Sequence, residues 1–141
     1  MLGLKSSNVN AQARSGLGVG ATINSSKVGL GYGGEVFGEI KVAKVVSLVP
    51  AIGYALPKGV SFSVNGRYFF EESLFVNAGP MLHLASLEHG DSGIGGSVGL
   101  GFSQRVSKIA VVDWNLNVDL IHYDRKMIPV CGVKLIFEGV F

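Results

Sequence analysis

The chain has 141 residues, enough for one domain, and its 48% hydrophobic and 16% charged residues exclude a disordered protein. The net charge of +2 is too small to indicate nucleic acid binding, and the single cysteine excludes an internal disulfide framework and a cysteine-based zinc site. The uncharged stretch at residues 45–57, like every other uncharged stretch of the chain, is too short for a transmembrane helix, which needs about 20 residues.

Residues 1–14 are predicted to form a polar tail. A secretory signal needs an apolar stretch of about 7–15 residues, but residues 6–10 are mostly serine and asparagine. Two explanations are open: either the native export signal has been removed, or the protein is not exported. We expect the first. Residues 15–141 are then predicted to form the single folded domain.

The rest of the chain alternates apolar residues with small or polar ones, and this period of two is typical of β-strands. The clearest segment reads V-D-W-N-L-N-V-D-L, and turn residues such as Pro57-Lys58-Gly59 separate the segments. The predicted strands are, in chain order, residues 16–23, 28–40, 48–56, 60–71, 74–84, 94–105, 112–120 and 131–138.

These segments predict an all-β fold, a closed antiparallel up-and-down transmembrane β-barrel of about eight strands with short connections at both ends. The connection near residues 41–44 is the weakest, and it leaves a ninth strand open. Pro50, Pro80 and Pro129 each lack the backbone N–H that a strand ladder uses, so we expect them near bulges or strand ends.

The bulk of the two strand faces indicates which one lies inside the barrel. An eight-stranded barrel is only just wide enough for side chains to fill its interior, and the large apolar residues would overfill it. The opposite face is too poor in lysine and glutamate for a soluble exterior. We therefore predict that the apolar face meets lipid. It contains Leu17, Val19, Leu30, Phe62, Val64, Leu82, Leu100, Val112, Trp114, Leu116, Val118, Leu135 and Phe137.

The other face is predicted to fill the lumen with polar side chains that pair with one another, because unpaired charges in a narrow interior are costly. The turn after the sixth strand is expected to bring Arg105 close to Asp113, and Arg67 is expected to reach Glu35 or Glu39 across the lumen. The predicted lumenal residues are Glu35, Glu39, Asn65, Arg67, Glu71, Asn77, His83, Arg105, Asp113, Asn115, Asn117, Asp119, Lys134 and Glu138.

A further pairing is expected at the last turn, which brings Lys134 near Asn117 and Asp119. Together these pairs predict a plug of ions that fills and stiffens the barrel. The alternative is a narrow pore that conducts small ions along the same polar face.

The chain resembles the small eight-stranded bacterial outer-membrane barrels, such as the OmpA transmembrane domain, OmpX and NspA. The features that carry this resemblance are the strand pattern, the mixture of inward charges and the final Phe141. The resemblance implies that Gly132, Leu135, Phe137 and Phe141 form the signal that the barrel-assembly machinery reads, although Val130 replaces its usual polar residue. It also implies a monomer in the bacterial outer membrane, with the lipid bilayer or detergent as its partner. The short connections do not favour the adhesin activity of OmpX-like proteins, and they leave open a loop-trimmed or designed barrel.

No catalytic, cofactor-binding or metal site is predicted, and the expected role is structural or one of surface interaction. The spacing of the three histidines matches no metal motif. Ser86, His89, Asp91 and Ser92 share one loop and suit a nucleophile and base, but they are also ordinary turn residues. A membrane lipid-modifying enzyme and a soluble ligand-binding barrel remain as alternatives. Cys131 is predicted to point outward, without a role.

Overall fold

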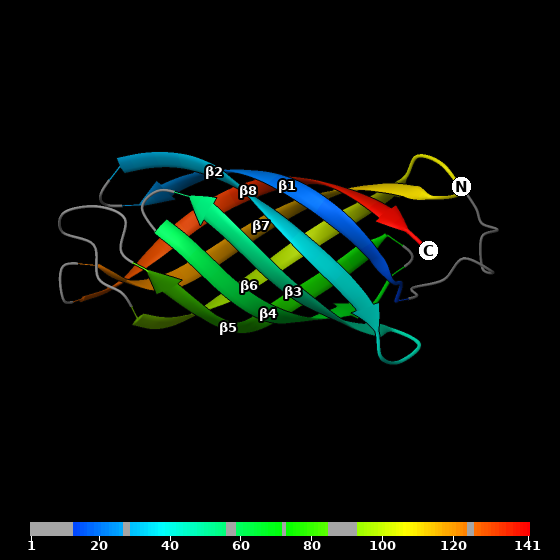
Figure 1. The fold of residues 1–141 in the computed structure, drawn as a ribbon, viewed down its shortest axis with the longest axis horizontal. Helices are drawn as coiled ribbons and strands as arrows, with labels where there is room; N and C mark the ends of the chain where they lie inside the picture. Colours follow the sequence, from blue (N-terminus) through cyan, green and yellow to red (C-terminus); the bar gives the residue numbers. More distant parts are fainter. Residues whose placement is uncertain (1–12, 27–28, 56–58, 72, 85–92, 124–125) are drawn as a thin grey trace.

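The computed structural model describes residues 13–26, 29–55, 59–71, 73–84, 93–123 and 126–141, and they form a closed barrel of eight strands (Figure 1). Every neighbouring pair is antiparallel, and β8 closes the barrel against β1. The predicted all-β, closed up-and-down barrel is confirmed. The strands are β1 (Gly16–Ser26), β2 (Gly29–Lys41), β3 (Val46–Ala55), β4 (Gly59–Phe69), β5 (Leu74–Leu84), β6 (Gly93–Arg105), β7 (Ala110–Tyr123) and β8 (Lys126–Val140).

The weak connection between the second and third predicted strands is a tight turn and not a ninth strand. The N–H groups of Val42 and Ala43 both donate to the carbonyl of Val46, at 3.1 Å each. This turn lies at the end of the barrel where β1 begins and β8 ends, because Gly16 stands opposite Val140. We call this end the terminal end; it also holds the β4–β5 and β6–β7 turns (Figure 1).

Five of the eight strands, namely β1, β3, β6, β7 and β8, are longer than the alternating pattern predicts, most of all at the start of β8. Ile128 and Val130 are both buried, while Pro129 and Cys131 between and after them are exposed. Both faces are therefore apolar in this stretch, so the sequence shows no polar and apolar alternation although the backbone ladder continues. Within the described residues, no helix is long and apolar enough to span a bilayer.

The expectation that the prolines lie at bulges or strand ends is wrong for Pro50 and Pro80. Pro50 lies inside β3, and pairing between β2 and β3 stops after Phe37 and resumes at Ile40 in the same register. Pro80 interrupts the β4–β5 ladder in the same way. Each proline removes one donor without shifting the register, which is why the barrel accepts it without a bulge. Pro129 lies near the start of β8.

Burial alternates along the strands, as predicted. The lumen contains small and ionic residues, but it also contains large apolar side chains that the strand pattern did not predict. Large side chains fill space that glycines on neighbouring strands leave free, as where Gly101 of β6 lies beneath the ring of its ladder partner Phe75 in β5. Three buried apolar clusters result. They are Ala13, Phe69 and Phe75; Phe37, Val49 and Ile136; and Met81, Ile121, Ile128 and Val130.

Candidate functional site

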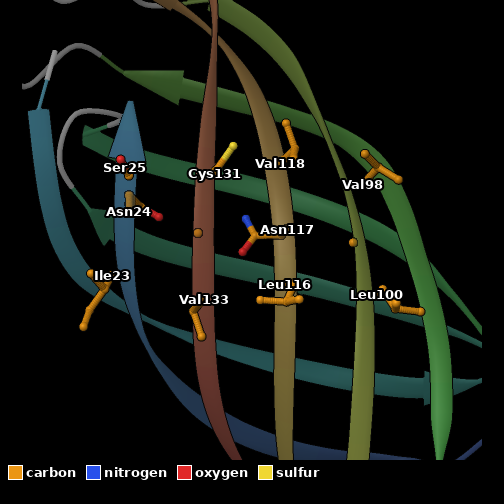
Figure 2. A pocket seen from close by; sticks show the side chains of 12 residues that line it. Ile23, Asn24, Ser25, Val98, Leu100, Leu116, Asn117, Val118, Cys131 and Val133 are labelled. Atoms are coloured by element: carbon orange, nitrogen blue, oxygen red, sulfur yellow. The ribbon is translucent and has the colours of Figure 1, made fainter. Parts of the chain in front are cut away.

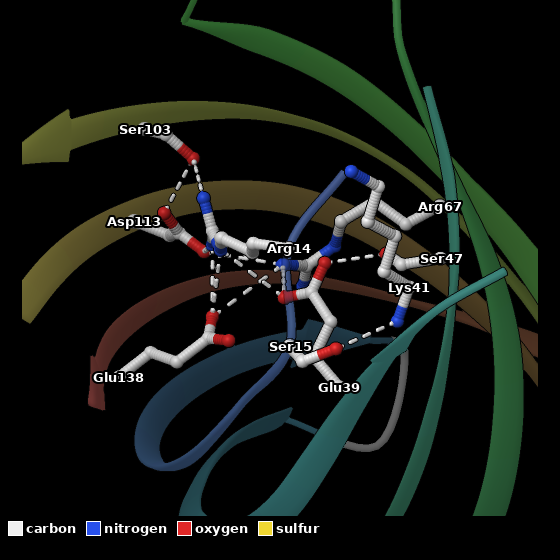
Figure 3. Close-up of polar contacts among 9 residues, drawn as sticks. All are labelled: Arg14, Ser15, Glu39, Lys41, Ser47, Arg67, Ser103, Asp113 and Glu138. Carbon is white, nitrogen blue, oxygen red and sulfur yellow. Dashed lines mark hydrogen bonds and ion pairs between the residues drawn. The ribbon is translucent and has the colours of Figure 1, made fainter. Parts of the chain in front are cut away.

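A network of buried charges lies inside the barrel near the terminal end (Figure 3). Four of its members come from strands that the closed barrel brings together: Glu39 of β2, Arg67 of β4, Asp113 of β7 and Glu138 of β8. Each of these four is 3% exposed or less. The fifth member, Arg14, precedes β1, so the site joins residues from nearly the whole length of the chain.

Arg14 contacts three carboxylates at once. Its Nη2 lies 2.6 Å from Oδ2 of Asp113 and 2.9 Å from Oε1 of Glu138, and its Nε lies 3.3 Å from Oε1 of Glu39. Its Nη1 donates to the hydroxyl of Ser103 at 3.1 Å. Burial by itself lowers the pKa of Arg14, but the three carboxylates outweigh this effect and raise it, so the guanidinium stays charged.

Arg67 supplies the second cation of the network. Its Nη1 lies 2.9 Å from Oε1 of Glu39 and 3.3 Å from Oδ2 of Asp113. Its guanidinium carbon lies 4.3 Å from the centre of the Phe75 ring, within the range of a cation–π contact. The expectation that Arg67 reaches across the lumen to Glu35 or Glu39 therefore matches the contact with Glu39.

Two serine hydroxyl groups add hydrogen bonds to two of the three carboxylates, those of Glu39 and Asp113. Ser47 stands opposite Arg67 in the β3–β4 register and donates a hydrogen bond to Glu39. Ser103 stands opposite Asp113 in the β6–β7 register and donates to it at 2.6 Å. These bonds offset part of the cost of burying three carboxylates with only two guanidinium groups.

A second ion pair lies apart from this network. Nζ of Lys134 is 2.9 Å from Oε1 of Glu35, with both side chains mostly buried. The expected approach of Lys134 to Asn117 and Asp119 is wrong, and Asn117 instead donates to Asp119 at 3.0 Å. Glu35 stands opposite Gly20 on one side of β1 and Lys134 stands opposite Thr22 on the other, so the two side chains meet across that strand.

Two residues that the sequence places in the lumen lie outside it. Arg105 ends β6 and is exposed, and its Nη1 donates to the carbonyl oxygens of Ser107 and Lys108 in the next turn. Glu71 is exposed in the turn after β4. The predicted pairing of Arg105 with Asp113 is therefore wrong. Where the chain leaves the barrel wall at the end of a strand, the alternation of residues no longer indicates which side chains point into the lumen. Of the other predicted lumenal residues, Asn65 is half-buried, and the buried ones are Asn77, His83, Asn115, Asn117 and Asp119.

Sequence reasoning missed Arg14, because the predicted polar tail contains it. The N–H of Ala13 donates to the carbonyl of Lys44 at 2.8 Å, and this bond holds the segment against the β2–β3 turn. The excess of carboxylates over arginines on the inward faces of the terminal end was the one available signal. Residues 1–12 of the predicted tail lie outside the described residues.

The outer wall is apolar. Every residue predicted to face lipid is exposed, apart from the half-buried Val112. A shallow hollow in the wall crosses β1, β8, β7 and β6, and its exposed lining is apolar except for Ser25 and Cys131 (Figure 2). Phe141 is exposed, and its N–H donates to the carbonyl of Ser15 at 2.9 Å.

The described residues contain no group of three or more histidine, cysteine, aspartate or glutamate side chains placed to hold a metal ion. The loop cluster of Ser86, His89, Asp91 and Ser92 lies outside the described residues. The chemistry that the described part of the barrel supports is therefore ion pairing inside and apolar contact outside.

No family model and no curated protein sequence matches the chain. Solved structures do match. Neisserial surface protein A (NspA) is 15% identical with a TM-score of 0.64, over 90% of this chain and 96% of that one. The N-terminal β-barrel domain of Pseudomonas aeruginosa OprF is 16% identical with a TM-score of 0.59, over 90% and 99%. A de novo designed transmembrane β-barrel is 12% identical with a TM-score of 0.59, over 93% and 99%. The chain thus has the fold of the small eight-stranded transmembrane barrels.

Proposed function

We propose that the protein is a monomeric integral barrel of the bacterial outer membrane, with a structural or surface-interaction role and no catalysis. The observation that carries this proposal is the outer wall, where large apolar side chains are exposed around the barrel; Leu30 is 81% exposed and Leu116 is 60% exposed. Soluble monomers rarely expose a continuous apolar surface of more than a few hundred Å². A closed barrel also satisfies its backbone hydrogen bonds internally, as lipid requires.

The test of this proposal is the dependence of the protein on detergent or lipid. The purified protein should stay monodisperse in micelles and aggregate when detergent is removed. It should also insert into preformed lipid vesicles. A monodisperse protein in plain buffer would instead support a soluble ligand-binding barrel. Incubation with phospholipid or lipopolysaccharide should leave the lipid unchanged, and lipid turnover would support an enzyme.

A closed lumen is the second part of the proposal. The two arginines and three carboxylates at the terminal end bridge β2, β4, β7 and β8, and the apolar clusters fill space on both sides of the charges. Charged groups that bond to one another offer permeating ions few free partners. We therefore propose that the wild-type barrel does not conduct.

The narrow pore is the alternative function, and one feature favours it. Arg14, which contacts three of the carboxylates, belongs to no strand and is held by the segment before β1. Planar-bilayer recordings should show no unitary conductance for the wild type. Stable openings of the wild type would support the pore. The variant Arg14→Ala, compared with Arg105→Ala at the rim, then reports whether Arg14 closes the lumen.

A further inference from the structure

The three turns at the terminal end share one backbone design. In each turn, the N–H groups of two successive residues donate to the carbonyl of the residue that opens the next strand. The donors and acceptors are Val42 and Ala43 to Val46, Phe70 and Glu71 to Leu74, and Val106 and Ser107 to Ala110, over 3.0–3.4 Å.

Each turn is also tied to the strand beside it. The carbonyl of the last turn residue, at Val45, Ser73 or Ile109, accepts a hydrogen bond from a neighbouring backbone N–H. The three bonds come from Phe69 at 2.9 Å, Ser103 at 2.6 Å and Val140 at 2.8 Å. The turns are therefore held at defined positions on the rim.

Two of these turns carry the same side-chain pattern. Residues 41–45 read K-V-A-K-V and residues 105–109 read R-V-S-K-I, whereas the third turn, residues 69–73, reads F-F-E-E-S. The third turn builds the same backbone without the pattern. The basic and β-branched residues are therefore not needed to form the turn, and their repetition needs another explanation.

The repeated pattern places cations beside exposed apolar side chains. Lys41, Lys44, Arg105 and Lys108 are all exposed. Next to them, Val42 is 53% exposed and Val106 is 54% exposed, and Ile109 is exposed as well. The β2–β3 and β6–β7 turns lie on opposite sides of the rim, because the β4–β5 turn separates them on one side and the chain termini separate them on the other.

Such a combination suits the boundary between lipid headgroups and acyl chains. Cations close to a membrane surface attract anionic lipids, each by an amount that corresponds to about a fivefold preference. The neighbouring valine and isoleucine side chains continue the apolar wall toward the headgroups. The acidic third turn, with Glu71 exposed, also exposes the apolar side chain of Phe70, but it has no cation.

We propose that the two basic turns bind the anionic headgroups of phospholipids at the terminal end and so hold the barrel from two opposite sides at a fixed depth in the bilayer. This inference rests on the proposed membrane location. It adds a class of lipid and names the residues that recognise it. The ligand is the phosphodiester group of a membrane lipid, and dissolved phosphate is the competing source of the same chemistry.

The experiment measures the preference of the reconstituted barrel for spin-labelled phosphatidylglycerol over spin-labelled phosphatidylcholine in mixed vesicles. The wild type should prefer phosphatidylglycerol severalfold, and added salt should weaken the preference. The variant with Lys41→Gln, Lys44→Gln, Arg105→Gln and Lys108→Gln should show a ratio near 1. If it fails to fold, the two variants with one turn neutralised each replace it, and each should lose part of the preference.

The matched control is Glu71→Gln, which changes charge in a turn of the same backbone design and should keep the full preference. Inorganic phosphate should reduce the preference no more than chloride at equal ionic strength; a stronger effect would assign the cations to dissolved anions and overturn the proposal. A wild type with no preference, or a four-site variant that keeps it, would also overturn it. A wild type that does not insert into vesicles would overturn the proposed membrane location instead.

Discussion

The replacement of Arg67 by methionine tests whether the lumenal charges act as one network. Methionine keeps most of the apolar stem but removes the guanidinium that lies 2.9 Å from Glu39 and 3.3 Å from Asp113. Among the described residues, Arg14 is then the only cation left beside the three buried carboxylates of the network. We expect a large loss of stability from this single change.

The expected magnitude follows from the burial of the partners. Removal of one member of a buried ion pair costs about 3–5 kcal/mol, because the remaining charges lose compensation that water does not replace. The three carboxylate side chains within 4.0 Å of Arg67, those of Glu39, Asp113 and Glu138, are inaccessible to solvent. The matched control is Arg105→Met. Arg105 has the same side chain but is exposed, and within the described residues it bonds only to turn carbonyls, so its loss should cost about 0–1 kcal/mol where no anionic lipid is present.

Urea-induced unfolding in phosphatidylcholine vesicles, which contain no anionic lipid for Arg105 to bind, measures the difference. Trp114, the single tryptophan, is half exposed on the outer wall and reports through its fluorescence whether the wall is in lipid or in water. A double-mutant cycle of Arg67→Met with Glu39→Gln should show a coupling free energy of about 0.5–3 kcal/mol. Equal losses for Arg67→Met and Arg105→Met would refute the reasoning, since they would mean that lumenal burial adds nothing.

Three further changes test other parts of the barrel by the same unfolding assay. Leu116→Arg places a charge on the lipid face and should cost about 2–4 kcal/mol if the residue lies near the bilayer midplane; a loss close to zero would argue against lipid contact. Gly101→Ala overlaps a lumenal phenylalanine ring and should cost about 1–3 kcal/mol. Gly66→Ala, where the nearest atom lies 3.9 Å away, should change little, and equal effects of the two substitutions would contradict the packing argument. Lys134→Met removes a less deeply buried pair and should cost less than Arg67→Met, so the reverse order would be unexpected.

The strands of the barrel were predictable because the alternate residues that point outward are apolar over most of the chain. Segments such as residues 112–120 alternate without exception, and the structure extends this strand to Ala110–Tyr123. The sequence pattern fails where both faces are apolar, as at Ile128 and Val130, since a period of two then leaves no trace. The backbone ladder depends on hydrogen bonds that every residue but proline can donate, so it continues regardless of the pattern.

The members of the charge network were only partly predictable. The alternation of residues along each strand placed four members on the inward face, where the structure has them: Glu39, Arg67, Asp113 and Glu138. The alternation does not indicate where a strand ends and the chain leaves the barrel wall, so it wrongly placed Arg105 in the lumen. It also gives no partner across the lumen, because that depends on register and on the length of each side chain.

The sequence by itself therefore determined the class of fold and which face of each strand is apolar, because those properties are local and repeat along the chain. Only the closed tertiary structure decided that Arg14, from outside the strands, meets Asp113 and Glu138. Those residues are about a hundred or more positions apart in the chain, and they become neighbours only when β8 pairs with β1. Closure was predictable from the strand pattern, but the residues that it brings together depend on the register of the whole sheet, which no local sequence signal gives.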